Sequence, residues 1–241
     1  MRKFSLLVFL LIASMLTINA QYNFFGKSIR GNGNVVKETR EVRPFTGVAA
    51  SSGINVYLFQ GNENKVVVEA DENLQDCIKI KVEGSTLKCS VDCSITRSKK
   101  LNVYVNFTDL KMIKASSGAD VYGETVIVSD RLNIESSSGA DVKVEVVAGS
   151  IYSNSSSGAG ILIKGKAGHL EANASSGADI KASELVVNTC KVSASSAGSI
   201  TVNVTEKIEG KASSGGDVVY YGNPPSEYIR ESSGGGVRRK Y

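Results

Sequence analysis

A seven-residue phrase with the consensus Ala-Ser-Ser-Gly-Ala-Asp-Val occurs eight times in this chain, and no other feature limits the fold as much. From the second copy onward the starts lie 18 to 21 residues apart. A period near 20 residues with strand-like content is the signature of a solenoid, in which equivalent positions of successive coils stack on one another. Because that stack forms the core, function has to lie on an outer face or at an end. The copies begin at Ala50, Ala115, Ser136, Ser155, Ala174, Ala194, Ala212 and Glu231.

The seventh position of the phrase is always a β-branched aliphatic residue. Such side chains are stiff and suit a pleated, buried surface, so we expect this column to point into the core. The fourth position is glycine except in one copy, where Ala197 stands. Glycine there indicates positive φ or a close backbone approach, and Ala197 predicts that positive φ is not obligatory in every coil. The seventh-position residues are Val56, Val121, Val142, Ile161, Ile180, Ile200, Val218 and Val237.

The residues between copies read as strands and bends. Asp141–Val146 alternates polar and apolar residues at the period of two that is typical of strands, and glycines and serines mark the bends. A coil of about 20 residues is too short for a propeller blade, which needs about 40. We therefore expect an all-β, single-domain parallel β-helix, or β-solenoid, with about 20 residues per coil and about 4.8 Å between coils.

The first two copies of the phrase start 65 residues apart, so the period is interrupted between Ala50 and Ala115. Strand-like stretches continue through this interval, and Glu83–Thr86 reads as the turn of a hairpin. We expect wider or less regular coils here, within one continuous stack. The domain prediction is accordingly residues 33–241, preceded by a lead-in at residues 21–32.

The first 20 residues have the pattern of an export signal. Arg2 and Lys3 form the basic start, Phe4–Leu16 is the apolar stretch, and Ile18–Ala20 supplies a cleavage site. The apolar run is short for a bilayer span, which disfavours the alternative of a membrane anchor and predicts no transmembrane span in the mature chain. Without Arg2 and Lys3, 26 basic residues face 24 acidic ones, and a net charge near +2 gives no reason to propose nucleic acid as a partner.

Export would permit disulfides among the cysteines at positions 77, 89, 93 and 190. Cys77 and Cys93 lie at opposite ends of the predicted hairpin, and we expect them to pair. Zinc is the alternative, but the C-x3-C spacing lacks a second matching pair, and the single histidine, His169, is far away in sequence. We expect Cys190 to be a small buried residue of a late coil.

The sixth position supplies the only acidic column of the phrase, Asp120, Asp141, Asp179 and Asp217. Neighbouring coils would place Asp120 and Asp141 about 4.8 Å apart, where two carboxylates repel unless a cation or solvent relieves them. One interpretation is a calcium site or the acid/base pair of a polysaccharide-cleaving enzyme. We favour a solvent-facing column that is a candidate ligand surface, and we assign no catalytic, cofactor-binding or metal-ligating residue.

Serines fill the second and third positions of the phrase. A serine nucleophile needs a base and an orienting group, and one histidine cannot serve eight equivalent sites. We instead expect hydroxyls that bond to one another and to the backbone of the bends, with His169 at the surface.

Aromatic residues are concentrated near the two ends of the chain, and tryptophan is absent. We expect them to cap the exposed ends of the solenoid rather than to bind sugar. These residues are Tyr22, Phe24, Phe25, Tyr220, Tyr221, Tyr228 and Tyr241.

Segments around the repeat add a family resemblance. Arg43–Val48, Gly53–Asn55, Val68–Asn73 and the ending from Gly222–Pro224 to Gly236 resemble the bacterial family named putative auto-transporter adhesin, head GIN domain. The resemblance covers about Gly33 to Tyr241. It implies a right-handed parallel β-helix that is exported to the periplasm, the outer-membrane surface or the outside of a Gram-negative bacterium. No catalytic residues come with the resemblance.

The function expected from these observations is that of a non-enzymatic envelope or surface protein, an adhesin or ligand-binding scaffold for an unknown glycan or protein ligand. The first alternative is a polysaccharide-binding or polysaccharide-cleaving β-helix protein that uses the acidic column. A second alternative is a purely structural envelope protein with partners at its ends. None of these interpretations requires a cofactor.

Overall fold

The computed structural model describes residues 28–241. The predicted signal peptide, residues 1–20, lies outside this part, as do residues 21–27 of the predicted lead-in with Tyr22, Phe24 and Phe25. Helical structure in the described part is a short 3₁₀ helix, Glu72–Cys77. No helix within residues 28–241 combines the length and the apolar character that crossing a membrane requires.

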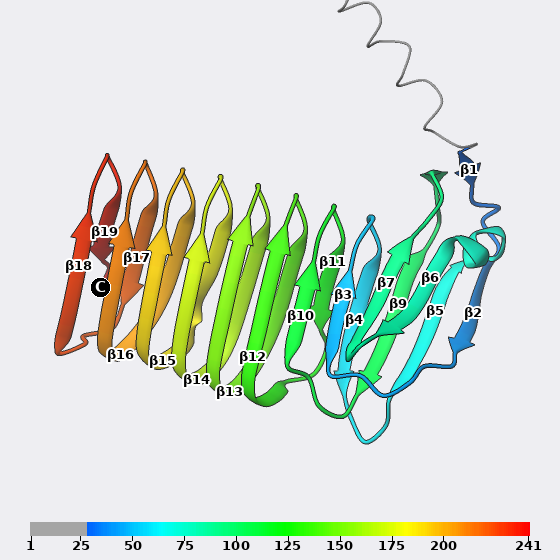
Figure 1. The fold of residues 1–241 in the computed structure, drawn as a ribbon, viewed down its shortest axis with the longest axis horizontal. Helices are drawn as coiled ribbons and strands as arrows, with labels where there is room; N and C mark the ends of the chain where they lie inside the picture. The colour runs from blue at the N-terminus through cyan, green and yellow to red at the C-terminus, as the bar shows by residue number, and fades with distance from the viewer. Residues whose placement is uncertain (1–27) are drawn as a thin grey trace, which may run out of the picture.

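The chain forms a β-solenoid of about seven turns with about 19 residues per turn, which confirms the fold class predicted from the period. Its middle consists of five long strands that pair in parallel, each with the next (Figure 1). Ile151, for example, lies between Leu132 of the preceding coil and Leu170 of the following one. The five strands are β12 (Ile127–Ser137), β13 (Asp141–Ser156), β14 (Gly160–Ala174), β15 (Asp179–Ala194) and β16 (Ser199–Ala212).

Each coil has two sides, which the seven-residue phrase joins at one edge (Figure 1). Residues that follow the phrase build the post-turn face, and residues that lead up to the next phrase build the pre-turn face. In β13, the part from Asp141 pairs with β11 on the post-turn face, and the part up to Ser156 pairs with β12 on the pre-turn face. Shorter strands of the post-turn face are β4 (Asn55–Gln60), β11 (Asp120–Gly123), β17 (Asp217–Tyr221) and β19 (Gly236–Arg239). Shorter strands of the pre-turn face are β3 (Gly47–Ala50), β10 (Met112–Ala115) and β18 (Ser226–Glu231).

The seventh column of the phrase points into the core between the two faces, as predicted. Its members from Val56 to Val218 each expose no more than 2% of their surface. The last member, Val237, is only partly buried, because no further coil packs over it. Where the phrase joins the two faces, the buried residues are small. Two of them are serines whose hydroxyls donate hydrogen bonds to nearby backbone carbonyls. Ser136 Oγ donates to the carbonyl of Ala140 at 2.7 Å, and Ser155 makes the same bond to Ala159 at 2.9 Å.

The phrase folds into a tight turn, here called the crest turn, over its second to fifth residues. The third and fourth residues both have positive φ, as in Ser176 at 54° and Gly177 at 69°. The N–H of Ala178 then donates to the carbonyl of Ser175 at 3.2 Å. Two successive left-handed residues define a type I′ turn. Successive crest turns also bond to one another, since the N–H of Gly177 donates to the carbonyl of Ser196 at 3.0 Å.

The expectation that Ala197 releases one coil from positive φ is wrong, because its φ is 58°. The N–H of Ala197 donates to the carbonyl of Ser214 at 3.2 Å, in the same place as the glycine N–H of other coils. The stacked turns therefore impose the left-handed conformation even on an alanine, at a cost of about 1 kcal/mol.

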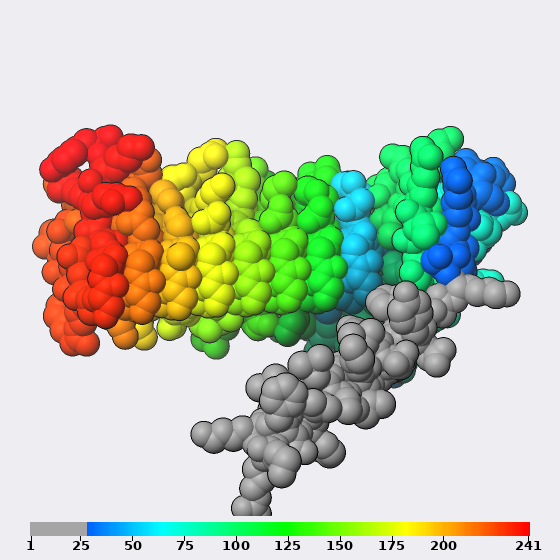
Figure 2. Space-filling view, turned by 90° about the horizontal axis from the view of Figure 1, so that it is seen from above, coloured from blue at the N-terminus to red at the C-terminus, as the bar shows by residue number. Residues whose placement is uncertain are grey.

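The interval between the first two phrases folds into the N-terminal end of the solenoid. β7 (Thr86–Val91) and β9 (Leu101–Phe107) continue the stack by pairing in parallel with β3 and β4. The hairpin predicted at Glu83–Thr86 is present, between β6 (Ile78–Glu83) and β7. β2 (Val35–Arg40) and β5 (Lys65–Asp71) pair antiparallel and close the end, which the sequence did not predict. The coil of β3 and β4 thus lies between segments that come later in the chain, and it stands as a cyan band between green ones in Figure 2.

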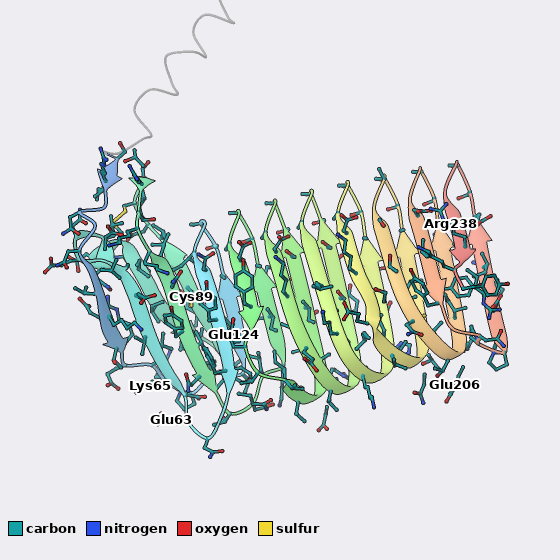
Figure 3. All side chains as sticks on the ribbon, turned by 180° about the vertical axis from the view of Figure 1, so that it is seen from behind. Glu63, Lys65, Cys89, Glu124, Glu206 and Arg238 are labelled. Carbon is teal, nitrogen blue, oxygen red and sulfur yellow. A yellow bond between two sulfur atoms is a disulfide. The ribbon has the colours of Figure 1, made fainter. Side chains whose placement is uncertain are left out.

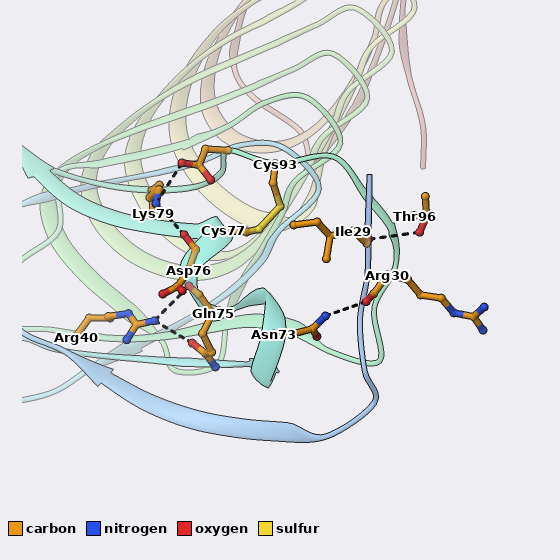
Figure 4. The surroundings of a disulfide bond; sticks show 11 residues. Ile29, Arg30, Arg40, Asn73, Gln75, Asp76, Cys77, Lys79, Cys93 and Thr96 are labelled. Atoms are coloured by element: carbon orange, nitrogen blue, oxygen red, sulfur yellow. Dashed lines mark hydrogen bonds and ion pairs between the residues drawn. A yellow bond between two sulfur atoms is a disulfide. The ribbon is translucent and has the colours of Figure 1, made fainter. Parts of the chain in front are cut away.

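Cys77 and Cys93 are joined by a disulfide, with Cα atoms 5.5 Å apart (Figure 4). Cys77 ends the 3₁₀ helix, and Cys93 follows β7 and leads into β8 (Ile95–Arg97), which pairs with β1 (Ile29–Arg30). The bond therefore ties the end of the 3₁₀ helix to the segment between β7 and β8. Cys190 is buried in the core of a late coil, as predicted.

The C-terminal coil carries charged residues where earlier coils carry core residues. Glu227 lies in register with the buried Ile208, and Glu231 with the buried Ala212. Glu231 accepts a hydrogen bond from the N–H of Val237 at 2.5 Å. Charges at core positions of the last coil hinder the addition of a further strand to this exposed edge.

Of the C-terminal tyrosines expected to cap the solenoid, Tyr220 is buried in the core in register with Val202, and Tyr221 is partly buried. Tyr228 is 51% exposed and Tyr241 is 99% exposed, so neither covers the core. The guanidinium groups of Arg230 and Arg239 lie over these two rings, 4.8 and 4.9 Å from the centroids.

Candidate ligand-binding face

The acidic column lies in one row on the outer side of the post-turn face. Asp120 of β11 pairs directly with Asp141 of β13. Gly160 separates Asp141 from Asp179, and Ser199 separates Asp179 from Asp217. The structure therefore brings the four aspartates onto one surface, but makes direct neighbours of the first two alone.

A second column, two residues further along each strand, supplies partners for Asp120 and Asp141. The hydroxyl of Tyr122 donates to Asp120 Oδ2 at 3.2 Å, and Lys143 Nζ lies 4.0 Å from Asp141 Oδ2. Burial and the neighbouring Asp120 carboxylate raise the pKa of Tyr122, so its hydroxyl remains a donor. The repulsion expected between the two aspartates is thus relieved by a phenol and an ammonium. The signal in the sequence was the polar residue two positions after Asp120, Asp141 and Asp179.

At the C-terminal end the partner comes from the next coil, where the guanidinium of Arg238, labelled in Figure 3, forms an ion pair with Asp217. The post-turn face therefore carries two adjacent rows in which carboxylates lie beside basic side chains in some coils, while Leu162 and Val219 occupy the second row in others. Within residues 28–241, no group of three or more histidine, cysteine, aspartate or glutamate side chains is arranged to hold a metal ion.

A hollow of about 230 Å³ opens in these rows at Gly160. Asp141 and Lys143 border it on one side, and Asp179 and Lys181 border it on the other. The missing side chain is what makes room: a Cβ at position 160 would stand 2.5 Å from Asp141 Oδ1. Leu162 supplies an apolar part of the lining.

This arrangement combines carboxylate acceptors and ammonium donors around a partly apolar floor. Concave sites with a few convergent polar groups are the usual form of small-ligand sites. Carboxylates accept and ammonium groups donate, so a ligand that carries hydroxyls could be bonded from both sides of the hollow. The described residues of the hollow can therefore orient a polyhydroxylated molecule.

Beside the hollow, Tyr104, Tyr57 and Tyr122 form a stacked tyrosine ladder that the sequence did not predict. The rings of Tyr57 and Tyr104 stack with centroids 5.2 Å apart, and those of Tyr57 and Tyr122 with centroids 5.3 Å apart. Lys37 Nζ lies 5.4 Å from the ring centroid of Tyr104, and Lys143 Nζ lies 5.4 Å from that of Tyr122. Because the ring faces meet each other and two ammonium groups, the ladder is a stabilising stack rather than an open platform for sugar rings.

Hydroxyls at the edge of the ladder join it to the acidic row. Tyr104 donates to Glu69 Oε2 at 2.7 Å, and Asn102 Nδ2 donates to the same oxygen at 3.1 Å. The hydrogen bond from the Tyr104 hydroxyl lowers the pKa of Glu69. Burial acts in the opposite direction, but Asn102 and Lys37 add to the lowering and together they outweigh it. The same bond, together with burial, raises the pKa of Tyr104. This network fixes the side chains at the N-terminal end of the post-turn face.

The remaining candidate nucleophiles do not converge on the acidic row. The third-position serines are exposed at the crest turns, and within residues 28–241 the second- and third-position hydroxyls form no hydrogen bond with one another, contrary to expectation. His169 Nδ1 lies 2.8 Å from Thr189 Oγ1 at the partly exposed bend. Burial raises the pKa of Cys89 and Cys190 to about 12, which makes both thiols poor nucleophiles.

The family model described as "putative auto-transporter adhesin, head GIN domain" matches residues 44–224. A comparison with curated proteins found no match.

Several solved structures are similar in fold. One described as a putative adhesin from Bacteroides fragilis has a TM-score of 0.82 and 21% identity, covering 89% of this chain and 100% of that chain. A putative adhesin from Parabacteroides merdae has a TM-score of 0.69 and 20% identity, covering 90% of this chain and 100% of that chain. A structure described as a putative lipid binding protein from Parabacteroides distasonis has a TM-score of 0.67 and 19% identity, with 89% and 100% coverage. At these identities the similarity concerns the fold alone.

Proposed function

The chain belongs to the putative auto-transporter adhesin, head GIN domain family, and we propose that it is an exported, non-enzymatic envelope or surface protein that binds a ligand on the post-turn face of its solenoid. The export-signal pattern of residues 1–20 and the adhesin description of the family support the proposed location. The mature protein in this proposal begins after residue 20 and uses residues 33–241 as one binding domain.

The observation that carries the proposal is the hollow at Gly160. Its four charged side chains stand on β13 and β15, the two strands that flank β14, and backbone pairing sets the register of all three strands from Gly160 to Leu162. A site on a rigid element holds its polar groups in place before the ligand arrives, which reduces the ordering cost of binding. Weak contacts at this hollow could also be multiplied along a row of similar charges, as in multivalent attachment.

The alternative of a polysaccharide-cleaving enzyme would use the same aspartates. Acid/base cleavage needs two carboxyl groups in different environments, one of which remains protonated. Asp141 and Asp179 instead occupy equivalent positions of the phrase on either side of Gly160, each followed two residues later by a lysine, so their surroundings are alike. A purely structural role, the remaining alternative, would not require the side chains around Gly160.

The test is a glycan array probed with the purified protein. The Asp179→Asn/Lys181→Gln variant, which removes both charges from one side of the hollow, should no longer bind the glycans that the parent binds. The matched control is Glu206→Gln/Lys207→Gln, which should bind like the parent because neither residue lines the hollow. Glu206 lies at the edge of the solenoid opposite the crest turns (Figure 3). Absence of any bound glycan, or equal binding by the hollow variant, would reject the proposal.

The enzyme alternative is separated by incubating the same protein with acidic and neutral polysaccharides. We expect no new reducing ends and no unsaturated sugars. Their release by the parent, together with loss of that release in Asp141→Asn or Asp179→Asn, would favour the enzyme.

A further inference from the structure

A second hollow lies on the pre-turn face, near the N-terminal end of the solenoid. Its volume is about 630 Å³, and β3 forms its floor between β7 and β10. Ala49 stands at the centre, in register with Lys88 of β7 on one side and Lys114 of β10 on the other. Two strand spacings separate the lysine backbones, which places them about 10 Å apart.

Two features of the side chains keep this hollow open. The floor residue Ala49 is small, whereas its neighbours on both sides are long. Lys88 pairs with Glu83 of β6, and Lys114 Nζ lies 3.2 Å from Glu135 Oε2 of β12. Both glutamates stand on the far side of their lysine from β3, so the two ammonium groups are drawn apart.

The chemistry of the lining follows from these contacts. An ammonium group has three donors, and the structure shows one carboxylate partner for each lysine in the described chain. Lys88 and Lys114 are each about half exposed, at 53% and 50% of the side chain, so donors remain available toward the hollow. Ser51 and Ser116 line the end toward the crest turns, and Thr86 lines the opposite end.

We propose that this hollow is a binding site for an anionic saccharide, whose carboxylate or sulfate group lies over Ala49 between the Lys88 and Lys114 ammonium groups. The serine and threonine hydroxyls match the neutral hydroxyls of the sugar. The site is on the opposite face from the Gly160 hollow and has a different charge pattern. Binding at one hollow can therefore be disproved without disproving binding at the other.

The surroundings favour a saccharide over a membrane surface. Glu83 and Glu135 stand at the two rims of the hollow, where a densely anionic bilayer would meet them directly. Glu83 also lines the hollow, but it stands on β6 beyond β7, and Glu135 stands on β12 beyond β10, so both glutamates are two strands away from Ala49, where the anionic group of a sugar would lie. Lipid vesicles therefore serve as the competing outcome of the test.

The experiment measures binding of tetragalacturonate and of a sulfated oligosaccharide to the purified protein by calorimetry, with maltotetraose as the neutral control. We expect one of the two anionic probes to bind, with affinity that falls as salt is raised, and the neutral probe to bind about tenfold more weakly or not at all. Lys88→Gln/Lys114→Gln should weaken binding about tenfold or more by removing both cations. Ala49→Leu should do the same by filling the floor while it leaves the charges in place.

The control is Lys164→Gln/Lys166→Gln, which removes two lysines of β14 that line neither hollow and should bind like the parent. Circular dichroism and thermal melting establish that each variant is folded. The proposal is overturned if neither anionic probe binds, if maltotetraose binds equally well, or if both the double lysine variant and Ala49→Leu bind like the parent. Binding to vesicles of anionic phospholipid, without binding to either anionic probe, would assign the hollow to a membrane instead.

Discussion

The carboxylate of Asp71 accepts a hydrogen bond from the backbone N–H of Gly33 at 2.6 Å, although the two residues are 38 positions apart. Its other oxygen accepts the N–H of Lys99 at 2.7 Å and that of Lys100 at 3.3 Å. Asp71 is 1% exposed, so one buried carboxylate connects three segments of the N-terminal end. A Cβ at Gly31 would stand 2.6 Å from the same carboxylate, which accounts for glycine at that position.

Asp71→Asn should therefore lower the free energy of unfolding by about 2–3 kcal/mol, because an amide cannot accept all three bonds and buries donors without partners. Urea unfolding of the variant and the parent measures the difference. The matched control is Asp76→Asn, an exposed aspartate on the neighbouring 3₁₀ helix (Figure 4), whose effect should be negligible. Equal stability of Asp71→Asn and the parent would contradict the role assigned to this carboxylate.

The same contact predicts a dependence of stability on pH. Burial alone would raise the pKa of Asp71, but hydrogen bonds from the N–H groups of Lys99, Gly33 and Lys100 outweigh it and lower the pKa. The unfolded value is about 3.9, so this contribution is complete above that pH and is lost as the pH falls through the lower folded value. Thermal midpoints measured between neutral and acid pH should fall less in Asp71→Asn than in the parent over this window.

The core assignment of the seventh column is tested by Ile180→Asp. Ile180 is 1% exposed, and a carboxylate there would be buried without a partner, which should cost several kcal/mol. Thr201→Asp, one residue after the equivalent Ile200 and on the outer side, should change stability by less than about 1 kcal/mol. Similar melting of the two variants would show that the inward assignment is wrong.

The strain in the crest turns predicts opposite effects for two small substitutions. Gly177 has φ of 69° and open space where a Cβ would stand, so Gly177→Ala should destabilise by about 1 kcal/mol through backbone conformation alone. Ala197→Gly should act with the opposite sign, because it removes the same strain from its coil. Chemical unfolding of both variants provides the measurement, and a common sign would refute the explanation.

The disulfide predicts a difference in reactivity among the four cysteines. Peptide mapping without reduction should recover Cys77 bonded to Cys93, while Cys89 and Cys190 stay unmodified by thiol reagents in the folded protein. Replacing both bonded cysteines with serine should cost about 3 kcal/mol, because the bond closes a loop with a sequence separation of 16. Finding all four thiols free would contradict the pairing.

The neutralised acidic row predicts tolerance to loss of charge. Asp120→Asn/Asp141→Asn removes a like-charge contact together with the partners of Tyr122 and Lys143, so the net change should stay within about 1 kcal/mol. Chelation of divalent metal should leave the melting temperature of the parent unchanged. A large fall on chelation that disappears in the double variant would instead establish a metal site.

Periodicity was sufficient to predict the relationships that repeat from coil to coil. Val121 and Val142 fall in the same core column, and Asp120 and Asp141 in the same outer row, because one period separates them in the chain. The hairpin at Glu83–Thr86 was also readable, since its turn residues are adjacent in sequence. Ala197 was misread because its conformation is set by hydrogen bonds to the next coil and not by its own preference.

The tyrosine ladder and the Ala49 hollow could not be predicted from the repeat. Tyr104 reaches Tyr57 because β9 returns to pair with β4 after a non-periodic interval, and Tyr122 arrives from the other side. The hollow depends on where Lys88 and Lys114 point, which their glutamate partners on other strands decide.

By itself, the sequence determined the solenoid, its core columns and the outer row of aspartates, because a fixed period puts equivalent residues next to each other through local backbone pairing. Only the tertiary structure decided which non-periodic segments lie beside the repeat and which way long side chains lean. Those relationships depend on the path by which the chain returns and on charges that meet only after it has returned.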